Sequence, residues 1–475
     1  MIELQFRGLI GEFANLNAAK IGFLVDHLQV VSIASGEVFE FSLGEAELAT
    51  LTTSDVIGPV GGGIVLTEAA FVDDQIWLWD NFDQRASIYE NGRLVPAVIG
   101  GTALTVSGTI GSLGGDYVLP SPDQNALSLL SGQNGAFTQL GAFTGGNKDY
   151  ISDISSMKTV LVDGREFLIA ASYDENGLSC FERQGDQIVL IDSIGSKDGI
   201  WVSGLTALET AEVAGEVFIV AASANANAIA TVRLNAQGVF FPTDQDWDTR
   251  DSRFAGVSEL ATFEWYDRDF VVAGGDDLGL SVMEVLPGGG IFQHGSIAQG
   301  LDWGIGGLTS LGAKVVGTEA QVFASGTLGA GVAQVEIDLS RTGDATVGTN
   351  ADDQLSGGWM DDLISGGAGD DALIGMAGDD VLIDGAGFDV LTGENGADVF
   401  VFMKDGSKDK IADFAKGEDR IHLGDWGQIY TRSALQITET PYGAEIAWGD
   451  EVLAVFTKNH RPIDLDTWGE DDFIF

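Results

Sequence analysis

Short apolar runs dominate the first 340 residues, and the most regular of them return about every 51 residues. The clearest four begin at Phe167, Phe218, Phe270 and Gln321. About ten residues after each start, a small residue opens a second apolar run, at Gly177, Ala228, Gly279 and Gly331. The runs are rich in Val, Ile and Phe, lack helical periodicity and are separated by Gly, Asn and Asp. This pattern predicts short β-strands joined by tight turns.

A period of about 50 residues accommodates four such strands, which is one blade of a β-propeller. Fainter copies begin at Ile76 and Tyr117, and a further copy is expected in residues 20–60. We therefore predict an all-β fold with a propeller of about seven blades over residues 1–340. A pair of β-sandwiches or a shorter propeller stays open, because the first two blades are poorly marked. Leu4–Phe6 and Val335–Ile337 are predicted to join the two ends of the ring in one sheet.

Residues 348–401 follow a different pattern, which repeats every nine residues six times without a gap. The sixth position of every repeat is an aspartate: Asp353, Asp362, Asp371, Asp380, Asp389 and Asp398. The eighth is always a large apolar residue: Leu355, Ile364, Leu373, Leu382, Leu391 and Phe400. Glycine recurs at the first, second and fourth positions. Each repeat thus offers one carboxylate and one core side chain.

These residue types in this order favour calcium binding. Glycines permit backbone angles that other residues avoid, so a turn can curl until its carbonyl oxygens converge, and Ca²⁺ takes six to eight oxygen ligands. Successive repeats should lie on opposite sides of a roll, so turns on one side are two repeats apart. The expected pairs are Asp353 with Asp371, Asp362 with Asp380, Asp371 with Asp389, and Asp380 with Asp398, about four sites. The other expected ligands are turn residues: Gly348, Asn350, Gly357, Gly366, Ala368, Gly375, Ala377 and Gly393.

The folding of this segment is expected to depend on the metal. Ordering the backbone costs about 1–2 kcal/mol per residue, whereas one buried apolar side chain per repeat returns only about 1.5–3 kcal/mol. No Lys or Arg lies between Arg341 and Lys404, so carboxylate repulsion opposes folding until cations neutralise it. We expect disorder without Ca²⁺ and folding at extracellular rather than cytosolic Ca²⁺ concentrations.

The nonapeptides resemble those of the repeats-in-toxin (RTX), or haemolysin-type, calcium-binding proteins. The departures from the family pattern include Ala351 and Met360, which replace the fourth-position glycine, and Asp384, which replaces a first-position glycine. Sites that use these turns are expected to be weak or empty. The segments from Gly396 to Leu423 resemble the strands that close the roll in secreted serralysin-type proteases. The resemblance implies a parallel β-roll over residues 341–403 and a closing region over residues 404–475.

In that family, an acidic and then apolar terminus such as Glu470–Phe475 belongs to the uncleaved signal of type I secretion. Met1–Arg7 lacks the basic start and apolar run of a Sec signal peptide, and no apolar stretch is long enough for a transmembrane helix. The single cysteine, Cys180, excludes an intramolecular disulfide. We therefore expect a secreted, extracellular or cell-surface protein with Ca²⁺ as its cofactor and the type I secretion machinery as a partner.

The net charge of −49 restricts the partners further. Residues 341–475 contain 28 acidic and nine basic side chains, so most of the excess negative charge belongs to the first 340 residues. Acidic surfaces on both parts argue against nucleic acid and anionic lipid as direct partners. Divalent cations could bridge such a surface to other acidic polymers or to copies of the same chain.

The role of the propeller is less constrained. The four histidines, His27, His294, His422 and His460, are far apart in the sequence, and no zinc motif, nucleophile elbow or phosphate loop appears. No catalytic residue is assigned, and we favour a binding or adhesion module for a glycan or cell-surface ligand. Six tryptophans could form an aromatic surface for this ligand, or they could equally fill the wedges between blades: Trp77, Trp79, Trp201, Trp247, Trp265 and Trp303.

Two alternatives stay open. One is a surface-layer or filament protein that self-associates when it binds calcium. The other is a secreted, lactonase-like propeller hydrolase that uses carboxylates and amides in turns. Its candidates are Asp123, Asn125, Asp174, Glu175, Asn176, Asn225, Asn227, Asp276 and Asp277. Asp and Asn also occupy turns for their own backbone reasons, and we favour that interpretation of these residues.

Overall fold

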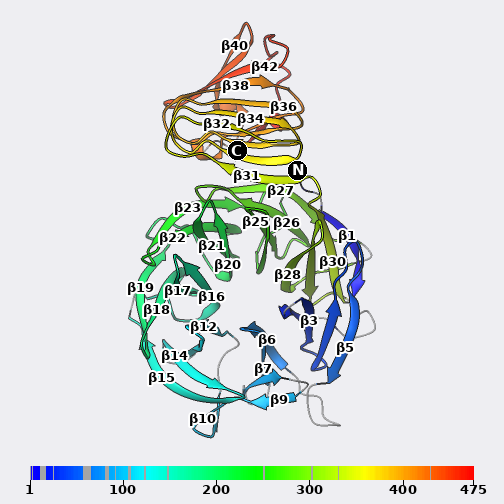
Figure 1. Cartoon of the computed structure of the whole chain (residues 1–475), viewed down its shortest axis with the longest axis vertical. Helices are drawn as coiled ribbons and strands as arrows, with labels where there is room; N and C mark the ends of the chain where they lie inside the picture. The colour runs from blue at the N-terminus through cyan, green and yellow to red at the C-terminus, as the bar shows by residue number, and fades with distance from the viewer. Residues whose placement is uncertain are drawn as a thin grey trace. The chain divides into compact units, whose positions relative to one another are not determined.

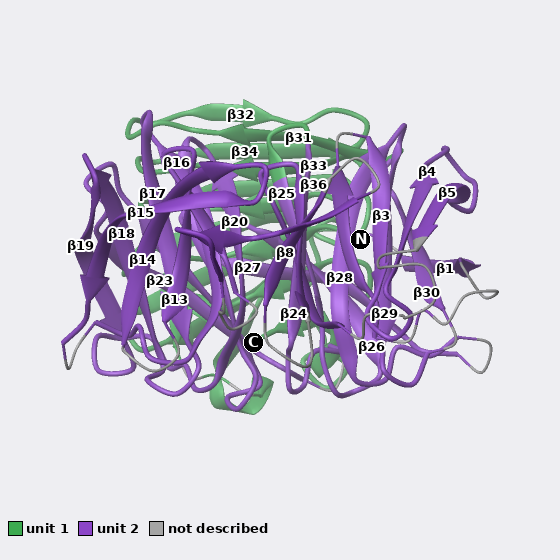
Figure 2. Cartoon of the chain, turned by 90° about the horizontal axis from the view of Figure 1, so that it is seen from below, with its two compact units in different colours: residues 1, 266–268, 340–475 green, residues 2–265, 269–339 purple. Residues whose placement is uncertain are grey.

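The computed structural model describes the chain apart from residues 1, 3, 11–15, 17, 25, 57–65, 81–84, 91–92, 105–108, 122–124, 147–148, 250–251, 301–302, 330, 428 and 430. Two compact units are present, one made of residues 2–265 and 269–339 and the other of residues 266–268 and 340–475 (Figure 2). Strands dominate both. The helices of the described residues are three short 3₁₀ turns: η1 (Gly424–Trp426), η2 (Arg432–Ala434) and η3 (Glu470–Asp472). None of them has the length or hydropathy needed to span a bilayer.

The first unit is a seven-bladed β-propeller, as predicted, with its described strands in seven sheets around a centre (Figure 1). Two blades come from the first hundred residues: β2 (Lys20–Leu24), β3 (His27–Ser32), β4 (Glu37–Ser42) and β5 (Thr50–Val56), then β6 (Leu66–Val72), β7 (Gln75–Asp80), β8 (Ala86–Glu90) and β9 (Arg93–Pro96). The third has six strands: β12 (Gly111–Leu113), β13 (Asp116–Ser121), β14 (Ala126–Gln133) and β15 (Ala136–Thr144), extended by β10 (Val98–Ile99) and β11 (Thr102–Ala103).

The next three blades are the most regular. They consist of β16 (Ile154–Val162), β17 (Arg165–Ser172), β18 (Gly177–Gln184) and β19 (Gln187–Gly195); β20 (Leu205–Val213), β21 (Glu216–Ser223), β22 (Ala228–Leu234) and β23 (Phe240–Trp247); and β24 (Glu259–Trp265), β25 (Arg268–Gly274), β26 (Gly279–Val285) and β27 (Ile291–Ala298). The apolar runs that recur every 51 residues form the second and third strands. The second strands, β17, β21 and β25, are almost completely buried, which explains their continuous rather than alternating apolar pattern.

The last blade closes the ring with strands from both ends of the propeller sequence. It contains β28 (Leu308–Val316), β29 (Glu319–Gly326), β30 (Val332–Asp338) and β1 (Leu4–Ile10). Leu4 lies opposite Ile337, and Phe6 lies opposite Val335, in an antiparallel pair. The predicted closure is confirmed, and it ties residues more than 300 positions apart into one sheet.

The second unit contains a parallel β-roll with two sheets. One sheet has the order β31 (Thr342–Val347), β33 (Asp361–Ser365), β35 (Val381–Ile383), β37 (Val399–Val401), β39 (Arg420–His422) and β43 (Phe473–Ile474). The other has the order β32 (Gln354–Ser356), β34 (Ala372–Ala377), β36 (Val390–Asn395), β38 (Lys408–Phe414), β42 (Glu451–Thr457), β41 (Gly443–Trp448) and β40 (Gln436–Thr440). Consecutive repeats therefore alternate between the sheets, and neighbouring repeat strands in one sheet are 18 residues apart.

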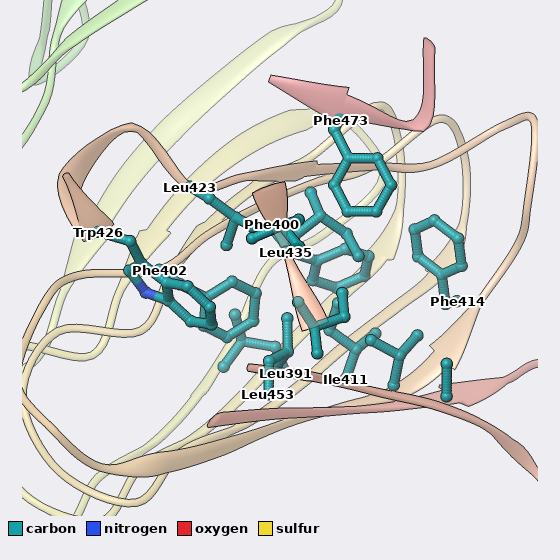
Figure 3. Packing of buried hydrophobic residues seen from close by; sticks show 14 of the residues in the cluster. Leu391, Phe400, Phe402, Ile411, Phe414, Leu423, Trp426, Leu435, Leu453 and Phe473 are labelled. Carbon is teal, nitrogen blue, oxygen red and sulfur yellow. The ribbon is translucent and has the colours of Figure 1, made fainter. Parts of the chain in front are cut away.

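The eighth-position side chains stack inside the roll, as the repeat predicts. Leu355 is in register with Leu373, and Leu373 with Leu391, while Ile364, Leu382 and Phe400 align in the other sheet. The closing region adds most of the bulk to this core, including Ile411, Phe414, Trp426, Leu453 and Phe473 (Figure 3). The repeats contribute Ile364, Leu373, Leu382, Leu391 and Phe400 to this core, and most of its other buried residues lie in the closing region. We therefore infer that the closing region supplies much of the apolar stabilisation of the roll.

Candidate metal centre

The sixth-position aspartates form two hydrogen-bonded ladders along the roll. On one side, the backbone N–H of Asp353 donates to Oδ1 of Asp371 (2.7 Å), and that of Asp371 donates to Oδ1 of Asp389 (2.7 Å). On the other side, Asp362 donates to Asp380 (2.8 Å) and Asp380 to Asp398 (3.0 Å) in the same way. The structure thus brings together each of the four pairs expected from the spacing. Whether each pair holds Ca²⁺ stays a prediction.

The second carboxylate oxygens differ along the array. The Oδ2 atoms of Asp371, Asp380 and Asp389 are buried and accept no hydrogen bond from the described protein. By contrast, Thr349 N–H donates to Asp353 Oδ2 (2.6 Å), and Gly358 N–H donates to Asp362 Oδ2 (2.6 Å). A buried, unsatisfied carboxylate oxygen costs free energy unless a cation meets it. The interior repeats are therefore the best prepared for a metal.

The first-position glycines leave space beside these oxygens. A Cβ on Gly366 would lie 2.6 Å from Asp371 Oδ2, and one on Gly375 would lie 2.3 Å from Asp380 Oδ2. The carbonyl oxygen of Gly366 would in turn lie 2.0 Å from a Cβ on Gly348. A side chain at Gly366 or Gly375 would therefore fill the space that carboxylate and carbonyl oxygens border. Oxygen donors of both kinds are what Ca²⁺ requires, so the residues present fit this ion.

The other predicted turn residues hold the stacked turns together. Gly357 N–H donates to the carbonyl oxygen of Ile374, Ala368 N–H to that of Thr349 (2.9 Å in both cases), and Ala377 N–H to that of Gly358 (3.2 Å). The carbonyl oxygen of Gly393 would lie 2.9 Å from a Cβ on Gly375. Asn350 lies exposed in the first turn. The use of these residues' carbonyl oxygens as ligands stays a prediction.

Burial makes the interior carboxylates unusually basic. It raises the pKa of Asp380 and of Asp389 to about 7 and that of Asp398 to about 8, and neighbouring carboxylates add to each increase. Asp353, in contrast, has its pKa held below the ordinary value by the amide and hydroxyl of Thr349. The interior of the array therefore favours a bound positive charge, either protons or a metal ion.

Sequence analysis missed two aspartates that continue the ladders into the closing region. Asp389 N–H donates to Oδ1 of Asp409, and Asp398 N–H donates to Oδ1 of Asp419 (3.1 Å in both cases). The sequence did contain a signal for these two aspartates. Asp409 and Asp419 each stand two residues before a buried isoleucine that aligns with an eighth-position residue of the repeats. The spacings of 20 and 21 residues, instead of 18, concealed it.

The fifth-position aspartates were also missed. Asp370 N–H donates to Asp352 Oδ1 (3.0 Å), and Asp379 N–H donates to Asp361 Oδ1 (2.8 Å). The side chains of Asp370 and Asp379 accept hydrogen bonds from the backbone N–H groups of Phe388 (3.0 Å) and Ala397 (2.9 Å), each two repeats further along the chain. These carboxylates therefore stabilise the stacking of turns through hydrogen bonds to the backbone. The Asp-Asp pairs in the repeats were the available signal.

Several propeller candidates have structural roles. Trp77 and Trp79 are completely buried, and Trp303 is almost so, which places them in the core. The side-chain amide oxygen of Asn176 accepts a hydrogen bond from Gly204 N–H (2.6 Å), and that of Asn227 accepts one from Gly256 N–H (2.7 Å). These two asparagines thus link their turns to the next blade. Asp123 lies outside the described residues.

The centre of the propeller contains a cavity of about 650 Å³, lined by the first strands of the blades. Lys20 pairs with Glu68 (3.1 Å) and Lys158 pairs with Glu209 (2.5 Å) across neighbouring strands. Burial raises the pKa of Glu259, which also lines the cavity, to about 7; Lys20 opposes this increase, while Glu68 and Glu209 add to it. The cavity is therefore polar and charged rather than apolar.

Comparison with known proteins identifies the repeat region. Residues 347–382 and 374–402 match the family model of the RTX calcium-binding nonapeptide repeat. No curated protein matches the chain. Among solved structures, the β-propeller domain of Cps50 (Swd1) from Myceliophteria thermophila is similar at 11% identity over 71% of this chain and 99% of that chain, with a TM-score of 0.45. A functionally unknown protein from Desulfotomaculum acetoxidans is 12% identical over 59% of this chain and 85% of that chain, with a TM-score of 0.40.

Proposed function

Residues 347–402 carry RTX calcium-binding repeats, and from this premise we propose that the protein is exported by type I secretion machinery and folds its β-roll outside the cell when Ca²⁺ binds. The propeller then acts as an extracellular binding or adhesion module. We assign the roll to residues 341–403 and the secretion signal to the closing region, residues 404–475.

One observation carries the folding proposal: the interior repeats bury carboxylates whose Oδ2 atoms accept no hydrogen bond from any described residue. Burying several like charges together is strongly unfavourable without a cation between them. With a dissociation constant near 10⁻⁴ M, millimolar Ca²⁺ stabilises the fold by about 1.4–2.7 kcal/mol per site. Cytosolic Ca²⁺ is far below this dissociation constant. The β-roll would therefore stay unfolded before export, and bound Ca²⁺ would stabilise its fold outside the cell.

The proposed binding role of the propeller rests on two exposed aromatic side chains. Trp201 is 71% exposed and Trp247 is 51% exposed. The side chain of Gln245 accepts a hydrogen bond from Trp201 N–H (3.0 Å) and donates one to its carbonyl oxygen (2.6 Å), which fixes the Trp201 backbone beside β23. Flat indole rings suit the apolar face of a sugar, and the acidic surface disfavours anionic polymers. We therefore propose a neutral glycan on a cell surface as the ligand.

The folding proposal is tested by far-ultraviolet circular dichroism with light scattering on the full chain, from chelator to about 10 mM Ca²⁺. The expected result is a gain of β signal at constant mass. An unchanged β signal over the whole titration would refute calcium-dependent folding. The glycan proposal is tested separately on a glycan array, where Trp201→Ala and Trp247→Ala should lose binding that Leu161→Ala, a change of another exposed residue, retains.

Self-association is the second candidate function, supported by apolar side chains exposed on the roll. Trp359 is 91% exposed, Phe388 47% and Met376 43%. If Ca²⁺ orders the turns that carry them, it could create a surface for other copies. Growth of particle mass in Ca²⁺ that reverses with chelator would support this function. A lactonase-like hydrolase is the third candidate, and two of the carboxylates that line the central cavity, Glu68 and Glu209, are paired with lysines.

A further inference from the structure

Asp384 occupies a position that is glycine in the other five repeats. Its carboxylate is buried, with only 1% of the residue exposed. Oδ1 accepts hydrogen bonds from Gly385 N–H (2.6 Å) and Met403 N–H (2.8 Å). Oδ2 is buried and accepts no hydrogen bond from the residues that the structure describes. The sequence predicted that this substitution would weaken the site, whereas in the structure it adds a buried carboxylate oxygen, Asp384 Oδ2.

Two more aspartates converge on this point. Asp389, from the same repeat, is completely buried, and its Oδ2 also accepts no hydrogen bond within the described part of the chain. Asp409 comes from β38, the strand next to β36 in the sheet, and is 2% exposed. One carboxylate oxygen from each of Asp384, Asp389 and Asp409 lies within 4.8 Å of the other two. Among the described residues, no other group of three acidic, His or Cys side chains meets this condition.

The surrounding charges do not neutralise the cluster. The charged groups that raise the pKa of Asp389 and Asp409 are further carboxylates: Asp371, Asp405 and Glu451 besides the cluster itself. The lysines of β38 are engaged elsewhere, with Lys408 Nζ paired to Glu445 (2.7 Å) and Lys410 Nζ over the ring of Phe456 (4.7 Å from its centroid). Three buried carboxylates that have no basic partner among the described residues need a cation or protons.

We propose that Asp384, Asp389 and Asp409 form an additional Ca²⁺ site, with three carboxylates instead of the two expected between regular repeats. This site would hold its ion at lower free Ca²⁺ than the regular sites, because affinity for Ca²⁺ rises with the number of charged ligands. Because Asp409 lies on β38, the ion would tie the fifth repeat to the closing region. The inference rests on the proposed calcium-dependent folding of the roll.

The experiment is hydrogen exchange with mass spectrometry on the full chain at buffered free Ca²⁺ concentrations. It compares peptides that cover β38 with peptides that cover β32 and β34. In the wild-type protein, β38 should become protected at lower free Ca²⁺ than the first repeats. Asp384→Asn should raise the free Ca²⁺ needed for half-maximal β38 protection by at least about tenfold, because one of three charged ligands is lost.

Glu394→Gln is the matched control, since it removes one negative charge from an exposed residue of the same repeat array, on β36. It should leave the β38 midpoint unchanged. Asp384→Gly supplies a second variant, with the residue found at this position in the other repeats. It should restore a regular two-carboxylate turn, and thus a β38 midpoint close to that of the first repeats.

The outcomes separate the ideas. If Asp384→Asn has the same β38 midpoint as the wild type and as Glu394→Gln, the three-carboxylate site is refuted, while calcium-dependent folding stands. If β38 protection in the wild type depends on pH but not on Ca²⁺, protons occupy the cluster and the site is likewise refuted. If Asp384→Asn keeps the midpoint and only Asp384→Gly loses protection, the role of Asp384 is to accept the hydrogen bonds of Gly385 and Met403. If no part of the roll responds to Ca²⁺, the proposed function itself fails.

Discussion

Replacing Asp380 with asparagine should destabilise the roll in Ca²⁺ and stabilise it in chelator. Asp380 belongs to two of the expected pairs: its Oδ1 accepts a hydrogen bond from Asp362 N–H, and its own N–H donates to Asp398 Oδ1. Asparagine retains the volume, the backbone hydrogen bond and an oxygen acceptor. It removes the negative charge associated with the buried, unsatisfied Oδ2. The substitution therefore tests the charge and leaves the ladder in place.

The magnitudes follow from the two states of the roll. In millimolar Ca²⁺, the loss of two sites should remove about 3–5 kcal/mol of stabilisation, at about 1.4–2.7 kcal/mol per site. In chelator at pH 8, the wild-type carboxylate is an uncompensated buried charge. Its pKa is raised to about 7, so its neutralisation should favour the metal-free roll by a few kcal/mol at most.

The assay counts bound Ca²⁺ by equilibrium dialysis and follows the β signal by circular dichroism in chelator and in Ca²⁺. Asp380→Asn should bind two fewer ions, need more Ca²⁺ to fold, and show a larger β signal than the wild type in chelator. Asp450→Asn, a change of an exposed residue in the turn between β41 and β42, is the control. An unchanged number of bound ions would show that the pairing of repeats two apart does not define the sites.

Three further predictions address other parts of the chain. Gly366→Ala should raise the Ca²⁺ concentration needed for folding, because its Cβ would lie 2.6 Å from Asp371 Oδ2. Gly469→Ala should not change it, because Gly469 is exposed, has a φ of −91° and would place its Cβ no closer than 3.8 Å to another atom. Equal midpoints for the two variants would contradict the proposed role of the glycine turn. Glu259→Gln should raise the melting temperature of the propeller at pH 8 but not at pH 4. The pKa of Glu259 is raised to about 7 in the fold, so the wild-type propeller loses stability as the pH rises from the unfolded pKa, near 4.3, to the folded pKa. An equal increase in melting temperature at both pH values would refute this. Deleting residues 1–10 should lower the melting temperature of the propeller by roughly 10 °C or more, because β1 supplies the edge strand of the closing blade; calorimetry that finds no change would show that this closure contributes little.

The periodicities in the sequence determined the architecture. A period of 51 residues placed the second and third strands of the regular blades, and the apolar segments near residues 5 and 336 predicted the closure of the ring. A period of nine predicted the roll and the pairing of aspartates two repeats apart. Periodicity carries this information because each repeat must bury the same side chain against the same neighbour, so local sequence and tertiary position stay in step.

Tertiary structure decided which oxygens are free to bind a metal. Asp353 and Asp371 share the same position in the repeat, yet Asp353 Oδ2 accepts a hydrogen bond from the Thr349 amide, whereas Asp371 Oδ2 accepts none from the described residues. Asp409 continues the ladder only because β38 pairs with β36 after an insertion that breaks the nine-residue spacing. Asp384 looked like a defect in the repeat, yet the fold buries it beside Asp389 and Asp409. Burial and hydrogen-bond satisfaction depend on neighbours that are distant in sequence, so they become visible only once the chain is folded.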